Sequence, residues 1–402
     1  MIREFISNIF FNTALGNGFY NELNQAGFLY MSLISVIAII IFRYSEKINL
    51  KVLYFFCFFF SAVTTLNVLR YMPYGGDAKI YCELTDYSQT SDVSIYNTTL
   101  KYTFNYPPIF ENIFTRLCAF NYVDNYYFYT LTFGILFLIL SKKQDKNIFL
   151  YTLYFFGSFL GLRWSLKTGN FVFLELVFLT LFVFNYKKNN PISYVFLILF
   201  GFQRIWYLLL IPIFLIIDRD QYFKKLQLIF VSSFFLILFN SNNLYSYISS
   251  LFSIEEGYSL FKETPGHNTP SIYLGFLNSL NLDSSLVALI IYSLLSFIFT
   301  FLFMRKKTLS RDIVAVVAIC FLILLNPYLK PYHFIFFVPL LLLIKDVYLV
   351  DTRSMLLSIL YPSIFWITAS NLSVGTITGY FQTVCFGLFV FNLVQLDLDR
   401  HD

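Results

Sequence analysis

The chain has 402 residues, of which 58% are hydrophobic and only 13% are charged. A soluble domain carries about 25% charged residues, so this composition excludes a water-soluble globular surface and indicates an integral membrane protein. The net charge is +5, and the five cysteines form no Cys-x-x-Cys motif.

Apolar runs recur along the chain at close to the length, roughly 20 residues, that crosses a hydrocarbon core. We therefore expect a single all-α, polytopic membrane domain over residues 1–402, with about 11–13 transmembrane helices. The spans are predicted at about 27–42, 52–70, 126–140, 148–162, 170–186, 192–203, 205–217, 226–240, 284–304, 312–326, 333–350, 354–370 and 379–396.

One pair of predicted spans, 192–203 and 205–217, is interrupted by Gln203 and Arg204. Irregular backbone at membrane depth is tolerated only inside protein or facing a cavity. An arginine at that depth is costly and is a functional candidate by default. The interruption predicts a broken or steeply turned hairpin that carries two polar groups.

Lysine and arginine follow every second predicted span, which is the pattern that the positive-inside rule requires of cytoplasmic connections. The clusters are Arg43 to Lys51, Lys142 to Lys146, Lys187 and Lys188, Arg219 to Lys225, Arg305 to Arg311, and Lys345 with Arg353. This alternation places the C-terminal tail in the cytoplasm, and thirteen spans would place the N-terminus outside. We expect a multi-pass protein of the bacterial inner membrane.

Two connections on the opposite, outward side are long, at about 71–125 and 241–283. Each contains an apolar stretch, Ile109–Phe120 and Leu244–Phe252, that is typical of a helix lying on the membrane surface. Cys82 and Cys118 share the first loop, and a disulfide between them is one option that the sequence leaves open.

The first outward loop opens with Tyr74-Gly75-Gly76-Asp77. Two glycines allow a sharp turn and the close approach of a ligand. A carboxylate at a membrane boundary is a candidate general base, and the alternative is an ordinary solvated acid. Farther on, Tyr106-Pro107-Pro108 stiffens the chain and begins a new helix. The alternative is that it marks only the start of a helix.

Basic residues on the outward side include Arg163 and Lys167, which follow the fourth span. They are four residues apart, so they share a helix face and suit either a phosphate or lipid headgroups. Two later outward turns carry histidines, Gly266 to Ser271 with His267 and Asn326 to His333 with Lys330. A single loop histidine is usually incidental, but both of these belong to the outward side.

These groups come from five connections and suit one cavity that transfers a sugar from a lipid-linked phosphosugar. Asp77 is the predicted base, and Arg163, Lys167, Arg204 and Lys330 are the predicted binders of the donor phosphate. The predicted substrate-binding residues are Tyr106, Asn170, Gln203, His267, Asn268 and His333, to which the family resemblance described next adds Tyr81. No DxD or HxH spacing indicates a tight metal site, no cofactor is implied, and a role for a divalent cation stays open.

The order of these elements resembles the C-type (GT-C) superfamily of membrane glycosyltransferases, in particular the bacterial polyprenyl-phosphate-mannose-dependent alpha-1,2-mannosyltransferase-like family. The resemblance rests on Asp77 followed by Tyr81, on Tyr106-Pro107-Pro108 and Gly169-Asn170, on the turn from Gly266 to Ser271, and on the turn from Asn326-Pro327 to His333. Serotype-converting bacterial glucosyltransferases share the same general plan. In both groups the resemblance implies an inverting transfer with the aspartate as base.

The expected donor is a polyprenyl-phosphate hexose, and the expected acceptor is a cell-envelope glycan or glycolipid at the periplasmic face. Nucleotide sugars are cytoplasmic, so an outward site needs a donor carried across on lipid. We expect no nucleic-acid partner. Two alternatives stay open: an O-antigen or capsule polymerase that uses diphosphate-linked repeat units, and a transporter or flippase, which would show paired halves and midplane charges.

Overall fold

The computed structural model describes residues 76–91, 93–96, 104, 106–126, 169–218, 220–240, 243–252, 285–305, 309–326, 336–340 and 342–344, with single positions at 128, 132, 135, 136, 139, 329 and 333 and the short pieces 390–391, 393–395 and 397–398. Within these residues every regular element is a helix. The helices are α4 (Gly76–Ser91), α5 (Pro108–Ala119), α9 (Val172–Lys187), α10 (Ser193–Gln203), the 3-10 helix η2 (Ile205–Leu209), α11 (Leu210–Ile217), α12 (Tyr222–Asn240), α13 (Leu244–Phe252), α15 (Ser285–Arg305), α16 (Arg311–Leu325) and α17 (Phe337–Leu340).

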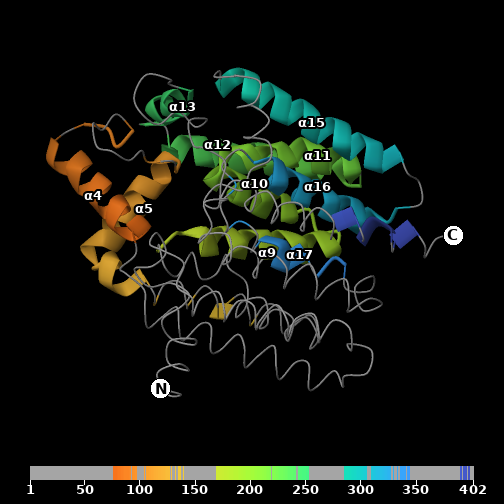
Figure 1. The fold of residues 1–402 in the computed structure, drawn as a ribbon, viewed down its shortest axis with the longest axis horizontal. Coiled ribbons are helices and arrows are strands. Elements are labelled where there is room, and N and C mark those ends of the chain that lie inside the picture. The colour runs from red at the N-terminus through yellow and green to blue at the C-terminus, as the bar shows by residue number, and fades with distance from the viewer. Residues whose placement is uncertain are drawn as a thin grey trace, which may run out of the picture.

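The centre of the described fold is the antiparallel pair α9 and α10, with α11 and α16 beside it (Figure 1). Nine of the sixteen residues of α9 are buried, which fits a helix that is apolar on all sides. Ten of the fifteen residues of α16 are buried as well, and its N-terminus is capped by the Ser310 hydroxyl, which accepts from the amide of Ile313. These two helices form the core of the bundle.

The interruption at Gln203-Arg204 is present, as the sequence predicts. Arg204 is extended, with φ −137° and ψ 101°, and it separates α10 from the short 3-10 helix η2. The chain turns back closely there, because a Cβ on Gly201 would lie 3.1 Å from Leu208. The ring of Phe200 stacks on that of Tyr207 with centroids 4.9 Å apart. The prediction of a steeply turned hairpin is confirmed.

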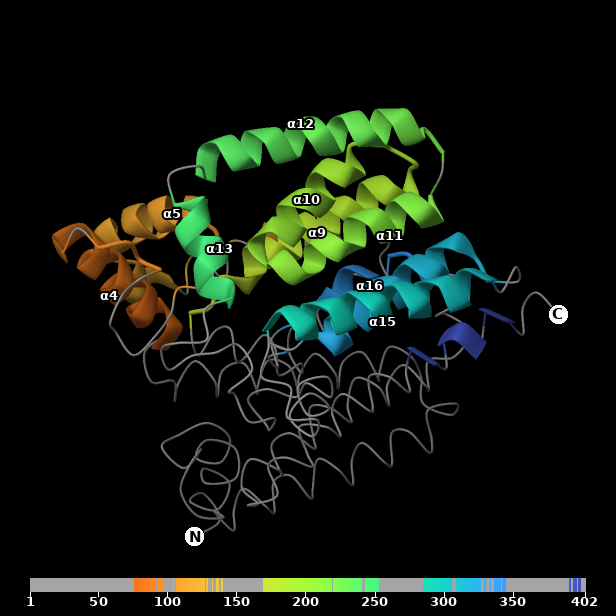
Figure 2. The same ribbon diagram turned by 90° about the horizontal axis from the view of Figure 1, so that it is seen from above.

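Helix α12 lies along one edge of the bundle (Figure 2). It is the one helix, within the described residues, whose length and apolar composition both suit a membrane crossing, and three further apolar helices are shorter. Its exposed face carries large apolar side chains, including Phe230, Phe234 and Phe239. The part of the chain that the structure describes is therefore helical, whereas the crossing of a membrane and the number of crossings stay predictions.

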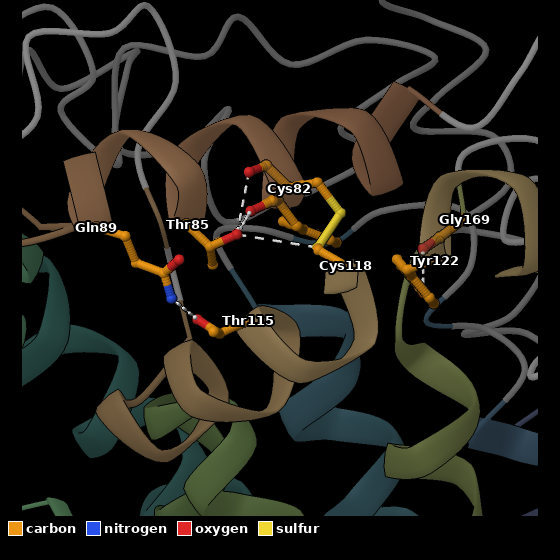
Figure 3. Close-up of a disulfide and its surroundings, with 8 residues drawn as sticks. Cys82, Thr85, Gln89, Thr115, Cys118, Tyr122 and Gly169 are labelled. Atoms are coloured by element: carbon orange, nitrogen blue, oxygen red, sulfur yellow. Dashed lines mark hydrogen bonds between the residues drawn. A yellow bond between two sulfur atoms is a disulfide. The ribbon is translucent and has the colours of Figure 1, made fainter. Parts of the chain in front are cut away.

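Helices α4 and α5 form a separate pair at one end of the bundle (Figures 1 and 2). Figure 3 shows the disulfide between Cys82 of α4 and Cys118 of α5, with the Cα atoms 5.5 Å apart. The Thr85 hydroxyl donates to the backbone oxygens of Tyr81 and Cys82, and the Gln89 amide donates to Thr115. The option of a disulfide in the first predicted outward loop is thus realised.

The interior of the α4–α5 pair is aromatic. Phe104, Tyr106, Phe110 and Phe114 are buried between the two helices, and neighbouring rings lie with centroids about 5 to 6 Å apart. The N-terminus of α5 meets the end of α12, where the Asn240 side-chain oxygen accepts from the amide of Ile109. These contacts fix the pair against the bundle.

The other end of the bundle is held by what we call the Asp218 cluster: Asp218, Lys225, Arg311, Tyr186 and Asn189. The buried Asp218 carboxylate lies 2.6 Å from Lys225 Nζ and 2.7 Å from an Arg311 nitrogen. Arg311 also donates to the Tyr186 hydroxyl and to the Asn189 side-chain oxygen. The cluster ties together the ends of α9 and α11 and the starts of α12 and α16.

One sequence expectation about the first loop needs correction. Residues 76–91 form a helix, whereas the sequence analysis treats them as part of a loop, and Asp77 lies in the first turn of this helix. The predicted spans at 27–42, 52–70, 148–162 and 354–370 lie outside the described residues, and those at 126–140, 333–350 and 379–396 are described only in part.

Candidate active site

Asp77 and Asn170 meet where the start of α4 contacts the start of α9. The Asn170 side-chain nitrogen donates to Asp77 Oδ2 at 2.9 Å and to the Tyr81 hydroxyl at 3.2 Å. Asn170 is 3% exposed, so its amide is held in a nearly dry environment. Residues 93 positions apart are thereby joined through one amide group.

The residue before Asn170 determines this geometry. Gly169 has φ +70°, a conformation that L side chains rarely adopt. A Cβ on Gly169 would lie 2.8 Å from the Cβ of Ala78 and 3.2 Å from the ring of Tyr126. The Tyr122 hydroxyl donates to the Gly169 carbonyl oxygen at 2.9 Å (Figure 3). Only glycine lets the chain pass this close to α4 and direct Asn170 toward Asp77.

Tyr81 and Tyr106 extend the hydrogen-bond network beyond Asp77 and Asn170. The Tyr106 hydroxyl donates to Asn170 Oδ1 at 3.3 Å, and it lies 3.4 Å from the Tyr81 hydroxyl. The two rings meet edge to face, with centroids 5.5 Å apart. Tyr106 is held from its other side as well, since the Tyr96 hydroxyl donates to its carbonyl oxygen at 2.7 Å. The amide oxygen and nitrogen of Asn170 are both engaged in this way.

Arg204 and Glu175 complete the arrangement from the bundle side. An Arg204 terminal nitrogen donates to the Tyr106 hydroxyl at 3.1 Å, and Arg204 Nε lies 3.1 Å from Glu175 Oε1. The guanidinium also lies over the Tyr106 ring, 4.9 Å from its centroid. The Glu175 side chain is fully buried and that of Arg204 is 12% exposed.

We call these six residues the Asp77 network: Asp77, Tyr81, Tyr106, Asn170, Glu175 and Arg204. They come from α4, the chain before α5, the start of α9 and the break after α10. The network thus combines two carboxylates with one guanidinium. Its carboxylate at Asp77 is a candidate proton acceptor.

Burial raises the pKa of Tyr106 to about 12, and the charges of Glu175 and Asp77 act in the same direction, while Arg204 and the Tyr81 hydrogen bond oppose them. The phenol consequently stays neutral throughout the physiological range, and it can both donate to Asn170 and accept from Arg204. Tyr106 is thus a fixed hydrogen-bonding element and does not titrate during a reaction near neutral pH.

Five sequence-predicted site residues are brought together here: Asp77, Tyr81, Tyr106, Asn170 and Arg204. Arg204 was expected to bind the donor phosphate, and the structure gives its guanidinium a protein carboxylate as partner. The remaining predicted residues Arg163, Lys167, Lys330, His267 and Asn268 lie outside the described part of the chain.

Gln203 and His333 are buried near the same end of α10 but make different contacts. The Gln203 amide donates to the carbonyl oxygen of Leu199 in its own helix. The His333 ring stacks on Phe336 and meets the edge of Tyr207, whose hydroxyl accepts from Asn326. Asn326 and His333 therefore both contact Tyr207.

Glu175 is the member of the network that the sequence analysis missed. It lies within the apolar run Val172–Val183, five residues after Asn170. An ionisable residue inside a predicted transmembrane segment is a functional candidate by default, and this signal was available. Among the described residues, no group of three or more histidines, cysteines, aspartates or glutamates is placed to hold a metal ion.

Comparisons of the chain with protein-family models, with curated proteins and with solved structures find no match.

Proposed function

We propose that the protein is a polytopic membrane glycosyltransferase of the GT-C type. It moves a hexose from a polyprenyl-phosphate donor to a glycan or glycolipid acceptor at the outer face of the bacterial inner membrane, with inversion. Asp77 is the general base. The observation that carries the proposal is the Asp77 network, which joins four distant parts of the chain around one carboxylate.

In the proposed reaction an acceptor hydroxyl lies beside the Asp77 carboxylate and gives its proton to it. The hydroxyl oxygen bonds to the anomeric carbon as the bond from that carbon to the phosphate oxygen breaks. The polyprenyl phosphate leaves with both bonding electrons. The charge of the leaving phosphate is stabilised by the predicted outward cations Arg163, Lys167 and Lys330.

The arrangement of the two ends of the bundle supports the proposed orientation. Three predicted cytoplasmic connections each contribute one residue to the Asp218 cluster at one end, namely Asn189, Lys225 and Arg311. The Cys82–Cys118 disulfide lies in the α4–α5 pair, which also carries Asp77. Disulfides persist in oxidising compartments such as the periplasm. A general base on the periplasmic side would act on sugar donors that reach that side attached to a lipid.

The test is a transfer assay with the purified full chain in lipid nanodiscs, polyprenyl-phosphate hexoses as donors, and membrane glycolipids as acceptors. We expect Asp77→Asn to lower the rate about 10²–10⁴-fold, the usual contribution of a general base. Asp86→Asn is the matched control, because Asp86 is an exposed acid on the same helix. Full activity of Asp77→Asn would refute the assignment of the base.

The polymerase alternative has a distinct outcome in a deletion strain. Loss of one side-branch sugar from the surface glycan supports the proposed transferase. Loss of polymer with single repeat units retained would instead identify a polymerase that uses diphosphate-linked units.

A further inference from the structure

Glu175 and Arg204 form an ion pair that lies beneath the tyrosines of the Asp77 network. Their atoms are 3.1 Å apart, Glu175 is fully buried, and Arg204 is almost so. Glu175 Oε2 has no hydrogen-bond partner among the described residues. The buried carboxylate is therefore compensated mainly through its other oxygen, by Arg204, and each charge depends on the other.

We propose that Glu175 is a positioning residue for Asp77, acting through Arg204, Tyr106 and Asn170. This inference rests on the proposed function and extends it to a residue that touches no substrate. Glu175 sets the orientation of the Arg204 guanidinium. The guanidinium in turn holds the Tyr106 hydroxyl, and Tyr106 holds the Asn170 amide that contacts Asp77.

Each link in this series is a hydrogen bond with one defined donor. Arg204 donates to Glu175 and to Tyr106, Tyr106 donates to Asn170, and Asn170 donates to Asp77. Arg204 has no acceptor atoms, so it can only bridge two acceptors, and the neutral Tyr106 hydroxyl must accept from it. The direction of every bond is thus set by the carboxylate at each end.

A second buried ion pair in the chain serves as a control that distinguishes a positioning role from an ordinary stabilising role. Asp218 is 5% exposed and pairs with Lys225 and Arg311 at the opposite end of the bundle. It resembles Glu175 in burial and in pairing, but no described hydrogen bond links it to Asp77. Asp218→Asn is therefore the matched control for Glu175→Gln.

The experiment measures transfer by Glu175→Gln, Glu175→Asp and Asp218→Asn in nanodiscs, each normalised to folded protein. A misplacement of about 1 Å at a reacting group costs up to about 10²-fold, so we expect Glu175→Gln to lower kcat about 10–100-fold. We expect the KM for the polyprenyl-phosphate donor to change less than about threefold, since the substrate contacts remain. Glu175→Asp keeps the charge and should recover part of kcat, and Asp218→Asn should leave kcat unchanged.

The two proposals fail in different ways. If Asp77→Asn is inactive while Glu175→Gln keeps its kcat, the positioning role is wrong and the proposed base stands. If Asp77→Asn is fully active, the proposed base is wrong. An equal loss of kcat in Glu175→Gln and Asp218→Asn would show that Glu175 is only a general stabilising residue and would overturn the positioning role.

A second measurement is independent of activity. Backbone hydrogen–deuterium exchange of residues 76–82 and 169–173 should be faster in Glu175→Gln than in the wild type, because the starts of α4 and α9 lose their shared contact. The same peptides should be unchanged in Asp218→Asn. Unchanged exchange in Glu175→Gln would overturn the inference whatever the substrate is.

Discussion

Gly169 shows how tightly single residues constrain the candidate site. Its positive φ and its approach to Ala78 place Asn170 beside Asp77, and Tyr122 holds its carbonyl oxygen. Three independent requirements therefore fall on one position: a backbone conformation, a short distance and a hydrogen bond. Asn170 cannot keep its position beside Asp77 if any of these three requirements is lost.

We expect Gly169→Ala to lower the transfer rate at least about tenfold, because displacement of Asn170 disorders the base. The strain of a left-handed alanine should also lower the free energy of unfolding by about 1–2 kcal/mol. Transfer assays and thermal unfolding in nanodiscs measure the two effects. Gly76→Ala is the control, since a Cβ there meets nothing within 4 Å, and equal behaviour of the two variants would contradict the role given to Gly169.

At the scale of elements, α4 and the segment just before α5 carry three members of the Asp77 network. Tyr81 directly precedes Cys82, and Tyr106 lies two residues before the start of α5. The crosslink, the aromatic interior and the contact of Ile109 with Asn240 all act on the same pair of helices. The position of Tyr81 relative to Tyr106 thus depends on how α4 and α5 are held together.

We expect the double variant Cys82→Ser/Cys118→Ser to lower the free energy of unfolding by about 2–4 kcal/mol, the usual effect of a crosslink of this loop length. The bond closes a separation of 36 residues. In denatured wild-type protein, Cys82 and Cys118 should take up an alkylating reagent only after reduction, whereas Cys320 should react without it. Labelling of Cys82 and Cys118 without reduction would show that the bond is absent.

Sequence patterns predicted the long apolar helices well and the polar helix poorly. Residues 192–203 were expected as one span and form α10 at Ser193–Gln203, since a continuous apolar run leaves few alternatives. Helix α12 begins at Tyr222, four residues before the predicted 226, because Lys225 folds inward onto Asp218. Helix α4 was missed because it has no apolar periodicity and begins next to two glycines.

At the scale of the whole molecule, α9 separates the two polar regions. Asn170 and Glu175 lie at its start, and Tyr186 lies at its end, beside Arg311. Its sixteen residues span about 24 Å at 1.5 Å per residue. The sequence predicts that the first of these regions faces outward and that the second faces the cytoplasm.

The division predicts opposite accessibility for two exposed positions, Asp86 in α4 and Lys188 after α9. In intact cells, a membrane-impermeant maleimide should label Asp86→Cys above the background of the parent protein. It should label Lys188→Cys only after the membrane is permeabilised. Labelling of both positions in intact cells would contradict the proposed topology.

The residue types of the site were predictable, and most of their partners were not. Asp77, Tyr106 and Arg204 are unusual in their local sequence, so they attract attention one at a time. The bonds that join them cross 64 to 98 residues, and no periodicity records a contact over that distance. Glu175 had a clear signal as an acid in an apolar run, but only the structure identifies its partner as Arg204.

The same separations have a consequence for biosynthesis. Cys118 is made 36 residues after Cys82, whereas Arg204 follows Tyr106 by 98 residues. At about 5–20 residues per second, roughly 5–20 s of synthesis separate Tyr106 from the arginine that holds it. Both helices of the α4–α5 pair are therefore synthesised well before Arg204. The Glu175–Arg204 ion pair cannot form until then. During that interval a nascent chain displays the candidate base without the groups that orient it.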